Sequence, residues 1–292
     1  MAKTIKQSAK PVQQTAKPRH SVVREKDATV KITVVVPWNE VEAVRKEIVD
    51  KLAKEITLPG FRKGMAPKEI AAAKLSKEKI QEELLKKILT DEYSKAVKEN
   101  NIQPIVNPRI HIEAFEDGTN LEFMAETCEE PKIELKNYKE EVKKLTAKSK
   151  IVIPGKDVEK VGLEKIVDVL LSTVEGTIPS VLVEQETNRL ISNLLDELKR
   201  MGVSLDQYLA SRSKNADELR KEYSHQAERD LKLEVVLRKI ADEEKITVEQ
   251  PDVETALGSL KDEDSRKEVL KNPYYLAAII RQQKALDFLS KL

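Results

Sequence analysis

The most unusual side chains in this sequence are an aromatic ring and two cations between glycines, Gly60-Phe61-Arg62-Lys63-Gly64. A ring contributes apolar area to an interface, and a guanidinium contributes directional, charged hydrogen bonds. At the tip of a loop, such a group suits docking on another macromolecule. In the alternative, Phe61 folds back under neighbouring helices and leaves Arg62 and Lys63 solvated. The residue types alone leave both interpretations open.

Residues that could carry catalysis or hold a metal are scattered. The three histidines, His20, His111 and His225, lie far apart in different predicted elements. His111 and Glu113 share a strand face by their two-residue spacing, and an exposed polar pair explains them. Neither a P-loop nor a GxGxxG fingerprint occurs, and the single cysteine, Cys128, cannot form an intramolecular disulfide or a multi-cysteine metal site. The sequence predicts no catalytic residues, no cofactor and no metal.

Composition restricts the class of protein further. Charged residues make up 35% of the 292 residues and aromatic residues only 4%, so the cores must consist mainly of Leu, Ile and Val. The 52 Lys and Arg residues nearly balance the 51 Asp and Glu residues. A global basic field for nucleic acid is therefore absent, and electrostatic recognition must come from local patches.

The chain begins with a polar segment. Residues 1–21 are rich in Lys, Gln, Ser, Thr and Pro, which predicts a disordered basic tail. This tail is either a tether to RNA or another acidic surface, or a solvated segment without a dedicated role. It has no apolar core of the signal-peptide kind, and no stretch of the chain approaches the roughly 18 to 20 apolar residues of a membrane helix. We therefore expect a cytoplasmic protein that does not contact a membrane.

Periodic patterns on both sides of the loop predict the strand and helices that position it. Structure is expected from about Ala28, with a strand that alternates apolar and polar residues up to Pro37. Asn39 is a candidate cap for an amphipathic helix over 40–57. After the loop, Pro67 suits the first position of a short helix over 68–75, and a long helix is predicted over 77–100. The loop thus lies at the tip of a helix–loop–helix.

A β-hairpin completes the first predicted domain. Ile110 and Ile112 alternate with polar residues before an Asp117-Gly118 turn, and the alternation continues with Leu121, Phe123 and Ala125. The fold prediction is a compact α+β domain over 22–130, with a small antiparallel sheet and helices. A charged connector is expected over 131–155.

The remainder, residues 156–292, predicts an elongated all-α domain with helical arms. Gly202 stands where a helix C-cap belongs, Ser204 with Gln207 predicts a capping box, and Thr247 with Gln250 is expected to open a further segment. Apolar residues at helical spacing and these capping signals predict helices over 161–174, 183–201, 205–211, 216–244 and from Asn272-Pro273 to the end.

These residues resemble those of a known family. The segment Gly60 to Pro67 matches every fixed position of Gly-Phe-Arg-x-Gly-x-x-Pro, the ribosome-docking signature of trigger factor, the bacterial ribosome-associated chaperone. The segments 177–183, 202–209, 227–233 and 284–289 resemble the helical part of the same family. The likeness covers roughly residues 22–292 in the family order.

The resemblance implies a function and its partners. By this resemblance, we expect an ATP-independent chaperone that docks beside the ribosomal exit tunnel, on a large-subunit protein and rRNA, and shields nascent or unfolded polypeptides. It also allows a homodimer off the ribosome. The ribosome-binding residues that it implies are Gly60, Phe61, Arg62, Lys63, Gly64 and Pro67.

The sequence departs from the family pattern in one large feature. Trigger factors usually carry an FKBP-like prolyl isomerase domain between the connector and the helical domain. Between Tyr138 and Tyr208 the chain has no aromatic residue, whereas an isomerase pocket needs aromatic walls and on the order of a hundred residues. We therefore expect a short form without isomerase activity. Met65 also stands where the family often has a basic residue.

Three other functions remain as alternatives. A prolyl isomerase would follow from the family label alone. An RNA-binding or ribosome-assembly factor would use the basic tail together with Arg62 and Lys63. A periplasmic helical chaperone is disfavoured because the sequence shows no export signal.

Overall fold

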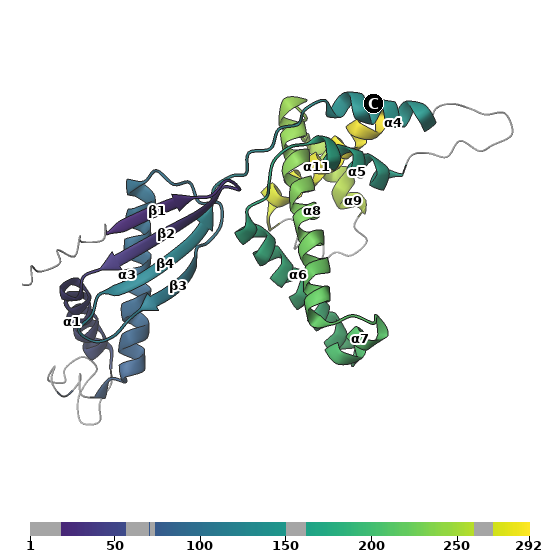
Figure 1. Ribbon diagram of the computed structural model, residues 1–292. Coiled ribbons are helices and arrows are strands. Elements are labelled where there is room, and N and C mark those ends of the chain that lie inside the picture. The colour runs from purple at the N-terminus through teal and green to yellow at the C-terminus, as the bar shows by residue number, and fades with distance from the viewer. Residues whose placement is uncertain (1–18, 57–69, 71–73, 150–161, 260–270) are drawn as a thin grey trace, which may run out of the picture. The chain divides into compact units, whose positions relative to one another are not determined.

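The structure is a computed structural model that describes residues 19–56, 70, 74–149, 162–259 and 271–292. The polypeptide forms two compact units. Unit 1 comprises the described residues up to Arg24 together with Val30–Thr127, and unit 2 comprises Glu25–Thr29 with Cys128–Leu292. Figure 1 shows the elements of both. The prediction of an α+β part followed by an all-helical part is confirmed.

Unit 1 is built on a four-stranded sheet with the order β1-β2-β4-β3. Its antiparallel hairpins pair His20 with Val34 and Arg109 with Glu126. A four-stranded sheet with one covered face is large enough to be stable once helices pack on it. The elements are β1 (His20–Arg24), β2 (Thr29–Val36), α1 (Trp38–Glu55), α3 (Lys77–Glu99), β3 (Arg109–Ala114) and β4 (Leu121–Cys128).

The alternation of apolar residues in the strands explains the core of unit 1. Every second side chain of β2 and β4 is fully or almost fully buried, as a period of two requires. These side chains form one cluster with the inner faces of α1 and α3. The cluster includes Val30, Ile32, Val34 and Val36 from β2, Leu121, Phe123 and Ala125 from β4, Val41, Ile48 and Leu52 from α1, and Leu84 and Ile88 from α3.

Two details of unit 1 differ from the sequence prediction. The first strand is β1, which begins at His20, inside the range predicted as a disordered tail. Its two adjacent valines lack the alternation that marks a strand, and pairing with β2 supplies the order. Asn39 lies inside α1 rather than capping it. Instead, the side chain of Asn120, distant in sequence, accepts a hydrogen bond from the backbone N–H of Trp38 at 3.2 Å.

Unit 2 contains helices whose bounds agree with most of the predicted ones. Its main core joins Val142, Leu170, Val236, Ile240 and Leu289 from four of these helices. The helices are α4 (Tyr138–Ser149), α5 (Leu163–Thr173), α6 (Ser180–Met201), α7 (Leu205–Ser211), α8 (Ala216–Glu243), α9 (Gln250–Ser259) and α11 (Pro273–Lys291).

The predicted connector is the largest difference from the sequence expectation. Within 131–155 the structure has a helix, α4, and Ile133, Leu135 and Tyr138 are buried in the core of unit 2. The Tyr138 hydroxyl also donates a hydrogen bond to Glu244 at 3.1 Å. In the sequence these apolar residues appear isolated among charges, and they become core residues because helices from far along the chain pack on them.

An arm is formed by α6, α7 and α8, which Figure 1 shows as two neighbouring helices with α7 near one end. The predicted caps are present: Gly202 ends α6 at φ +70°, and Ser204 and Gln207 form the capping box of α7. The end of the arm that carries α7, here called the arm tip, has its own small core of Leu194, Leu198 and Leu219. Leu195, which helical spacing predicts on the buried side of α6, is 42% exposed.

Candidate functional site

The six predicted ribosome-binding residues, Gly60, Phe61, Arg62, Lys63, Gly64 and Pro67, lie outside the described residues. The chain that contains them leaves α1 after Glu55 and returns before α3 at Lys77. These two helices share a core, and Lys87 of α3 forms an ion pair with Glu47 of α1 at 2.6 Å. The segment that contains these residues is therefore joined at both ends to helices that pack on one core.

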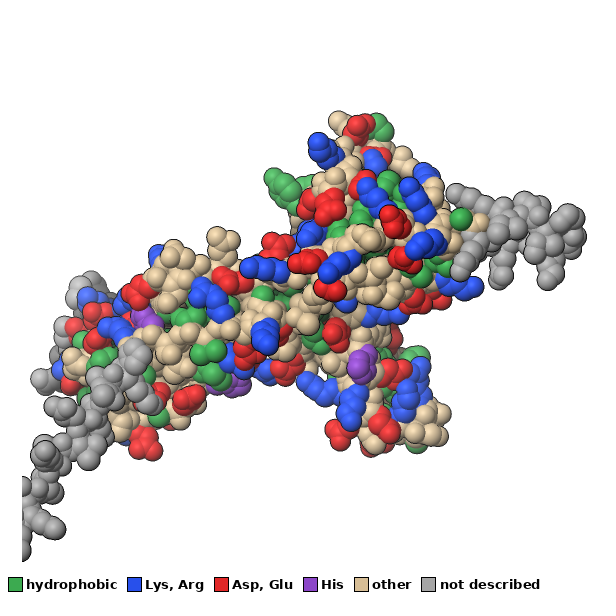
Figure 2. Space-filling model, turned by 45° about the horizontal axis from the view of Figure 1, so that its top comes forward, with side chains coloured by type: hydrophobic (Ala, Val, Ile, Leu, Met, Phe, Trp, Pro, Cys, Tyr) green, Lys and Arg blue, Asp and Glu red, His purple; other side chains and the backbone are tan. Residues whose placement is uncertain are grey.

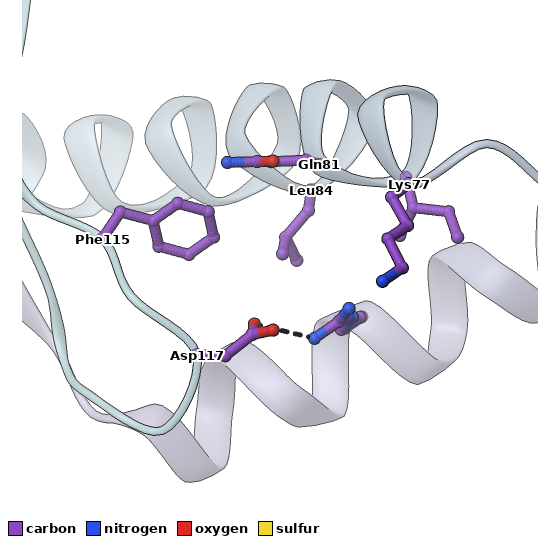
Figure 3. Close-up of a pocket in the computed structure, with 7 residues that line it drawn as sticks. Lys77, Gln81, Leu84, Phe115 and Asp117 are labelled. Atoms are coloured by element: carbon purple, nitrogen blue, oxygen red, sulfur yellow. Dashed lines mark hydrogen bonds and ion pairs between the residues drawn. The ribbon is translucent and has the colours of Figure 1, made fainter.

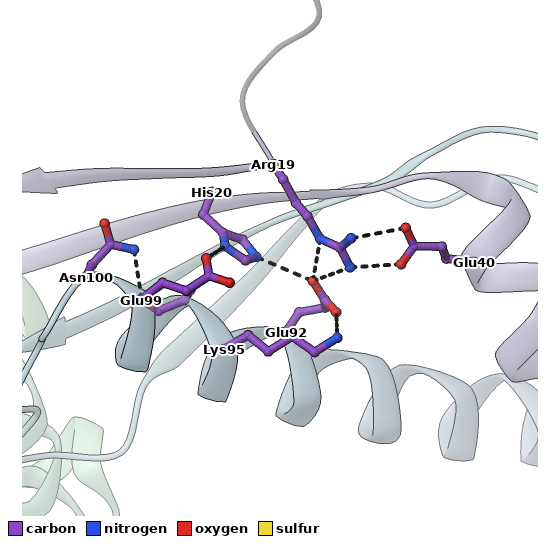
Figure 4. A network of polar contacts seen from close by, with 8 residues as sticks. Arg19, His20, Glu40, Glu92, Lys95, Glu99 and Asn100 are labelled. Carbon is purple, nitrogen blue, oxygen red and sulfur yellow. Dashed lines mark hydrogen bonds and ion pairs between the residues drawn. The ribbon is translucent and has the colours of Figure 1, made fainter.

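A network of charges fastens β1 to this helix pair, as Figure 4 shows. The Glu92 carboxylate of α3, only 5% exposed, accepts from the Arg19 guanidinium at 2.9 Å and from the Lys95 ammonium at 2.7 Å. Arg19 also donates to Glu40 of α1 at 2.8 Å. His20 lies between Glu92 and Glu99, with its Nδ1 2.8 Å from the Glu99 carboxylate. The Glu92 carboxylate thus attaches the start of β1 to α3, and Arg19 extends the network to Glu40 of α1.

The environment of Glu92 favours its charged form. Burial by itself would raise the pKa of this carboxyl, but hydrogen bonds from Lys95, Arg19 and His20 outweigh burial and hold the pKa below its usual value. A buried charge with several donors is stable, whereas the same charge without them would be costly.

Unit 1 also has a cavity of about 230 Å³ between α1, α3 and the turn that joins β3 to β4. Leu84 points from α3 into the space bordered by Phe115 and Asp117 (Figure 3). Arg45 of α1 closes one side through an ion pair with Asp117 at 3.0 Å. The complete lining is Arg45, Lys77, Ile80, Gln81, Leu84, Phe115 and Asp117.

In unit 2, a wider groove of about 450 Å³ runs between α6 and α8, beside the first turns of α6. Its walls mix apolar and charged side chains, and Arg220 lies 3.6 Å from Glu184 across it. Such a surface offers contact area without a deep apolar anchor pocket. The lining residues are Ile178, Ser180, Val183, Glu184, Thr187, Arg220, Ser224 and Glu228.

Several large apolar side chains of unit 2 remain exposed to solvent. Met201 and Val203, at the arm tip, are 65% and 36% exposed, and Tyr274 and Tyr275, at the start of α11, are 87% and 63% exposed. Basic and acidic side chains are interspersed over the face seen in Figure 2. In the described part of unit 2, exposed apolar side chains therefore occur singly or in pairs rather than as one continuous patch.

The titratable residues singled out in the sequence lie apart in the described part of the chain. No group of three or more His, Cys, Asp and Glu side chains among the described residues could hold a metal ion. Cys128 is buried, and burial together with the negative charge of Asp27 raises the pKa of its thiol to about 11, so it is protonated at neutral pH. His111 and Glu113 are exposed on β3, as expected of a solvated polar pair. No helix in the described ranges has the length and apolar character needed to cross a bilayer.

Sequence reasoning missed the Glu92 network. A glutamate at position 92 looks like one of many solvated helix acids, and Arg19 falls within the predicted tail. The available signal was its helical register: Leu84, Ile88, Glu92 and Ala96 repeat every four residues, which places Glu92 on the buried face of α3.

Comparison with known proteins decides the family. The model of the bacterial trigger factor protein (TF) matches residues 20–166, and the model of the bacterial trigger factor protein (TF) C-terminus matches residues 134–291. The chain belongs to the bacterial trigger factor family. The two matched ranges overlap, so no sequence lies between the family's N-terminal and C-terminal parts for a separate isomerase domain.

Individual trigger factors match part of the chain. The trigger factor of Corynebacterium kroppenstedtii is 34% identical over 120 residues, which cover 41% of this chain and 24% of that protein. The trigger factor of Macrococcus caseolyticus is 39% identical over 108 residues, 37% of this chain and 25% of the relative. The trigger factor of Acetivibrio thermocellus is 39% identical over 120 residues, which cover 41% of this chain and 27% of that protein. The chain thus spans about a quarter of the length of these relatives in the matched regions.

A solved structure shares the fold over nearly the whole chain. It comes from work on promiscuous substrate recognition in the folding and assembly activities of the trigger factor chaperone. The match has a TM-score of 0.56 at 16% sequence identity and covers 93% of this chain and 99% of that one. At this identity the likeness establishes the trigger factor fold.

Proposed function

We propose that this chain is an ATP-independent chaperone that docks on the ribosome and shields nascent or unfolded polypeptide. Residues 22–130 would bind the ribosome, and residues 156–292 would hold the client. The observation that carries the proposal is the complete Gly-Phe-Arg-x-Gly-x-x-Pro match from Gly60 to Pro67, in a segment that joins α1 to α3 within the family's matched N-terminal range.

The docking chemistry follows from the loop residues. Phe61 would contribute buried apolar area against a large-subunit protein at the exit tunnel, while Arg62 and Lys63 would contact that protein and adjacent rRNA. Contacts between these cations and phosphate release counterions, so binding should weaken as salt rises. The helix pair supports this role because it fixes both ends of the loop segment to a packed core.

Client holding would be the task of unit 2. The mixed groove between α6 and α8 and the exposed apolar points, Met201 and Tyr274 among them, offer weak contacts spread over a large area. Weak, distributed contacts allow a chaperone to hold a chain and release it without nucleotide hydrolysis. The proposal includes a cytoplasmic location, where ribosomes are found, and no prolyl isomerase activity.

The decisive experiment is co-sedimentation with 70S ribosomes. It compares wild type with Phe61→Ala/Arg62→Ala/Lys63→Ala, which we expect to lose at least about tenfold in affinity, on the order of 1.4 kcal/mol. A matched control, Lys86→Ala/Lys98→Ala, removes the same two positive charges from exposed positions on α3 and should bind like wild type. Circular dichroism confirms that each variant is folded.

Unchanged binding of the folded triple variant would exclude the loop as the ribosome-binding site and leave the basic tail as the candidate. In that event, deletion of residues 1–17 tests the RNA-binding alternative, because loss of ribosome affinity in the deletion alone would favour it. Failure of the wild type to sediment with ribosomes would contradict ribosome docking altogether.

A further inference from the structure

None of the residues given as the lining of the cavity between α1, α3 and the β3–β4 turn is among the predicted ribosome-binding residues. Its volume of about 230 Å³ lies below the roughly 300–1,000 Å³ of sites for drug-sized ligands. A cavity of this size suits a single side chain of a partner rather than a whole cofactor.

One part of the cavity is apolar. Ile80 and Leu84 come from successive turns of α3, and the ring of Phe115 lies on the same side of α3 as Leu84 (Figure 3). Leu84 is 3% exposed and belongs to the core of unit 1, so this wall is rigid. Apolar walls held by a packed core favour an apolar group that fills the space and displaces water.

The rim of the cavity is charged with an excess of positive sign. Arg45 and Lys77 stand against one carboxylate, Asp117, whose ion pair with Arg45 measures 3.0 Å. The Asp117 side chain is 78% exposed and Arg45 is 37% exposed, so the pair borders on solvent and can exchange partners. An incoming carboxylate would find Arg45 and Lys77 as donors.

We propose that this cavity binds one apolar side chain of a ribosomal protein, with a neighbouring Asp or Glu of that protein contacting Lys77 and Arg45. The apolar wall of the cavity favours a polypeptide over RNA, because RNA carries no apolar side chain that could fill it, and the net positive charge of the rim favours an acidic polypeptide. The inference rests on the proposed ribosome docking and adds a second contact beside the loop: Lys77, which lines the cavity, is the first residue of α3.

The ligand class is tested on the full chain with a small probe. N-acetyl-leucine combines an apolar side chain with a carboxylate, and N-acetyl-leucinamide is its uncharged match. Titration followed by methyl NMR should shift the signals of Ile80 and Leu84 saturably with N-acetyl-leucine and at least about fivefold more weakly with the amide. Equal affinity for the two probes, or shifts that do not saturate, would overturn the assignment of the ligand.

The partner is tested with ribosomes and two exposed substitutions. Gln81→Trp fills the cavity with a large ring, and Lys77→Glu reverses the charge of the rim. Both should lower ribosome affinity by about tenfold, whereas Lys79→Glu, an equal charge change on α3 outside the cavity lining, should have a smaller effect.

The outcomes separate this inference from the proposed function. If the loop triple variant loses binding while Gln81→Trp and Lys77→Glu bind like wild type, the cavity is not a ribosome contact and the loop assignment stands. If Lys79→Glu weakens binding as much as Lys77→Glu, general charge explains the effect and the cavity inference falls. If the wild-type chain does not bind ribosomes, both proposals are wrong.

Discussion

At the scale of single residues, one buried carboxylate organises the junction of β1 and α3. The Glu92 carboxylate lies within 3.4 Å of Arg19, Lys95 and His20 at this junction. Each donor contributes more in this buried position than it would on the surface, because a hydrogen bond to a desolvated charge is a strong one. Glu92 therefore attaches the start of β1 to α3.

Substitution of Glu92 should reveal this role as a loss of stability with a defined pH dependence. Glu92→Gln keeps the shape and removes the charge, and we expect the free energy of unfolding to fall by about 1–3 kcal/mol at pH 7. The folded-state pKa of Glu92 lies below its usual value of 4.5. Its contribution is therefore present above that value and lost as the pH falls through the folded-state pKa.

Urea unfolding of wild type and Glu92→Gln at several pH values measures this effect. The difference between the two should shrink as the pH falls below 4.5, where the unfolded carboxyl takes up a proton, and should disappear below the folded-state pKa, where the folded carboxyl is also neutral. Asp91→Asn, at the neighbouring exposed position of the same helix, is the control and should change stability little. A difference between wild type and Glu92→Gln that is independent of pH would contradict the electrostatic explanation.

At the scale of elements, two backbone segments of unit 2 that are distant in sequence lie against each other at Glu134 and Glu175. Glu134 and Glu175 exchange backbone hydrogen bonds of 2.8 and 3.0 Å, which place the segment before α4 beside the segment before α6. Gly176 follows with φ +135°, and a Cβ there would lie 2.7 Å from the carbonyl oxygen of Lys132. Only glycine fits both the dihedral angle and the space.

Gly176→Ala should therefore destabilise unit 2 by about 1–3 kcal/mol, from backbone strain at this positive φ. The close contact with Lys132 adds to this loss. Gly162→Ala is the matched control, because Gly162 has an ordinary φ of −61° and a Cβ at this position would have no atom within 4 Å. Thermal or urea unfolding compares the two variants. Equal stability of both would mean that the Glu134–Glu175 bridge can move to accept a side chain.

At the scale of the whole molecule, the two family matches follow each other directly along the chain. The N-terminal range ends at residue 166, and the C-terminal range begins at residue 134. The residues in this overlap supply α4 and part of α5, and both helices belong to the core of unit 2. The described residues of the overlap are therefore part of the helical unit.

This organisation predicts a chaperone without isomerase activity. In a protease-coupled assay of prolyl-peptide isomerisation, the chain should leave the uncatalysed rate unchanged, because an apolar pocket with aromatic walls is needed to bind the proline. An FKBP-type isomerase at equal concentration is the positive control. The same preparation should suppress aggregation of an unfolded client without ATP. A clear acceleration of isomerisation would show that another part of the chain forms such a pocket.

The sequence by itself determined most of the local structure of this protein. A period of two identified β2, β3 and β4, helical spacing identified the long helices, and Gly202, Ser204 and Asn272 marked helix ends where the structure has them. These predictions are confirmed because periodicity and capping depend on residues close together in the chain. The family also followed from the sequence, since its signature is a continuous segment; the roles of Gly60 to Pro67 remain a prediction.

Only the tertiary structure decided the rest. The burial of Glu92, the cap that Asn120 provides to Trp38, the inclusion of Tyr138 in a core and the cavity around Leu84 all join residues far apart in the chain. A charge or a lone apolar residue has the same local sequence signal on the surface and in the interior. Its environment is created when distant helices and strands pack on it, and that packing energy is a property of the folded chain.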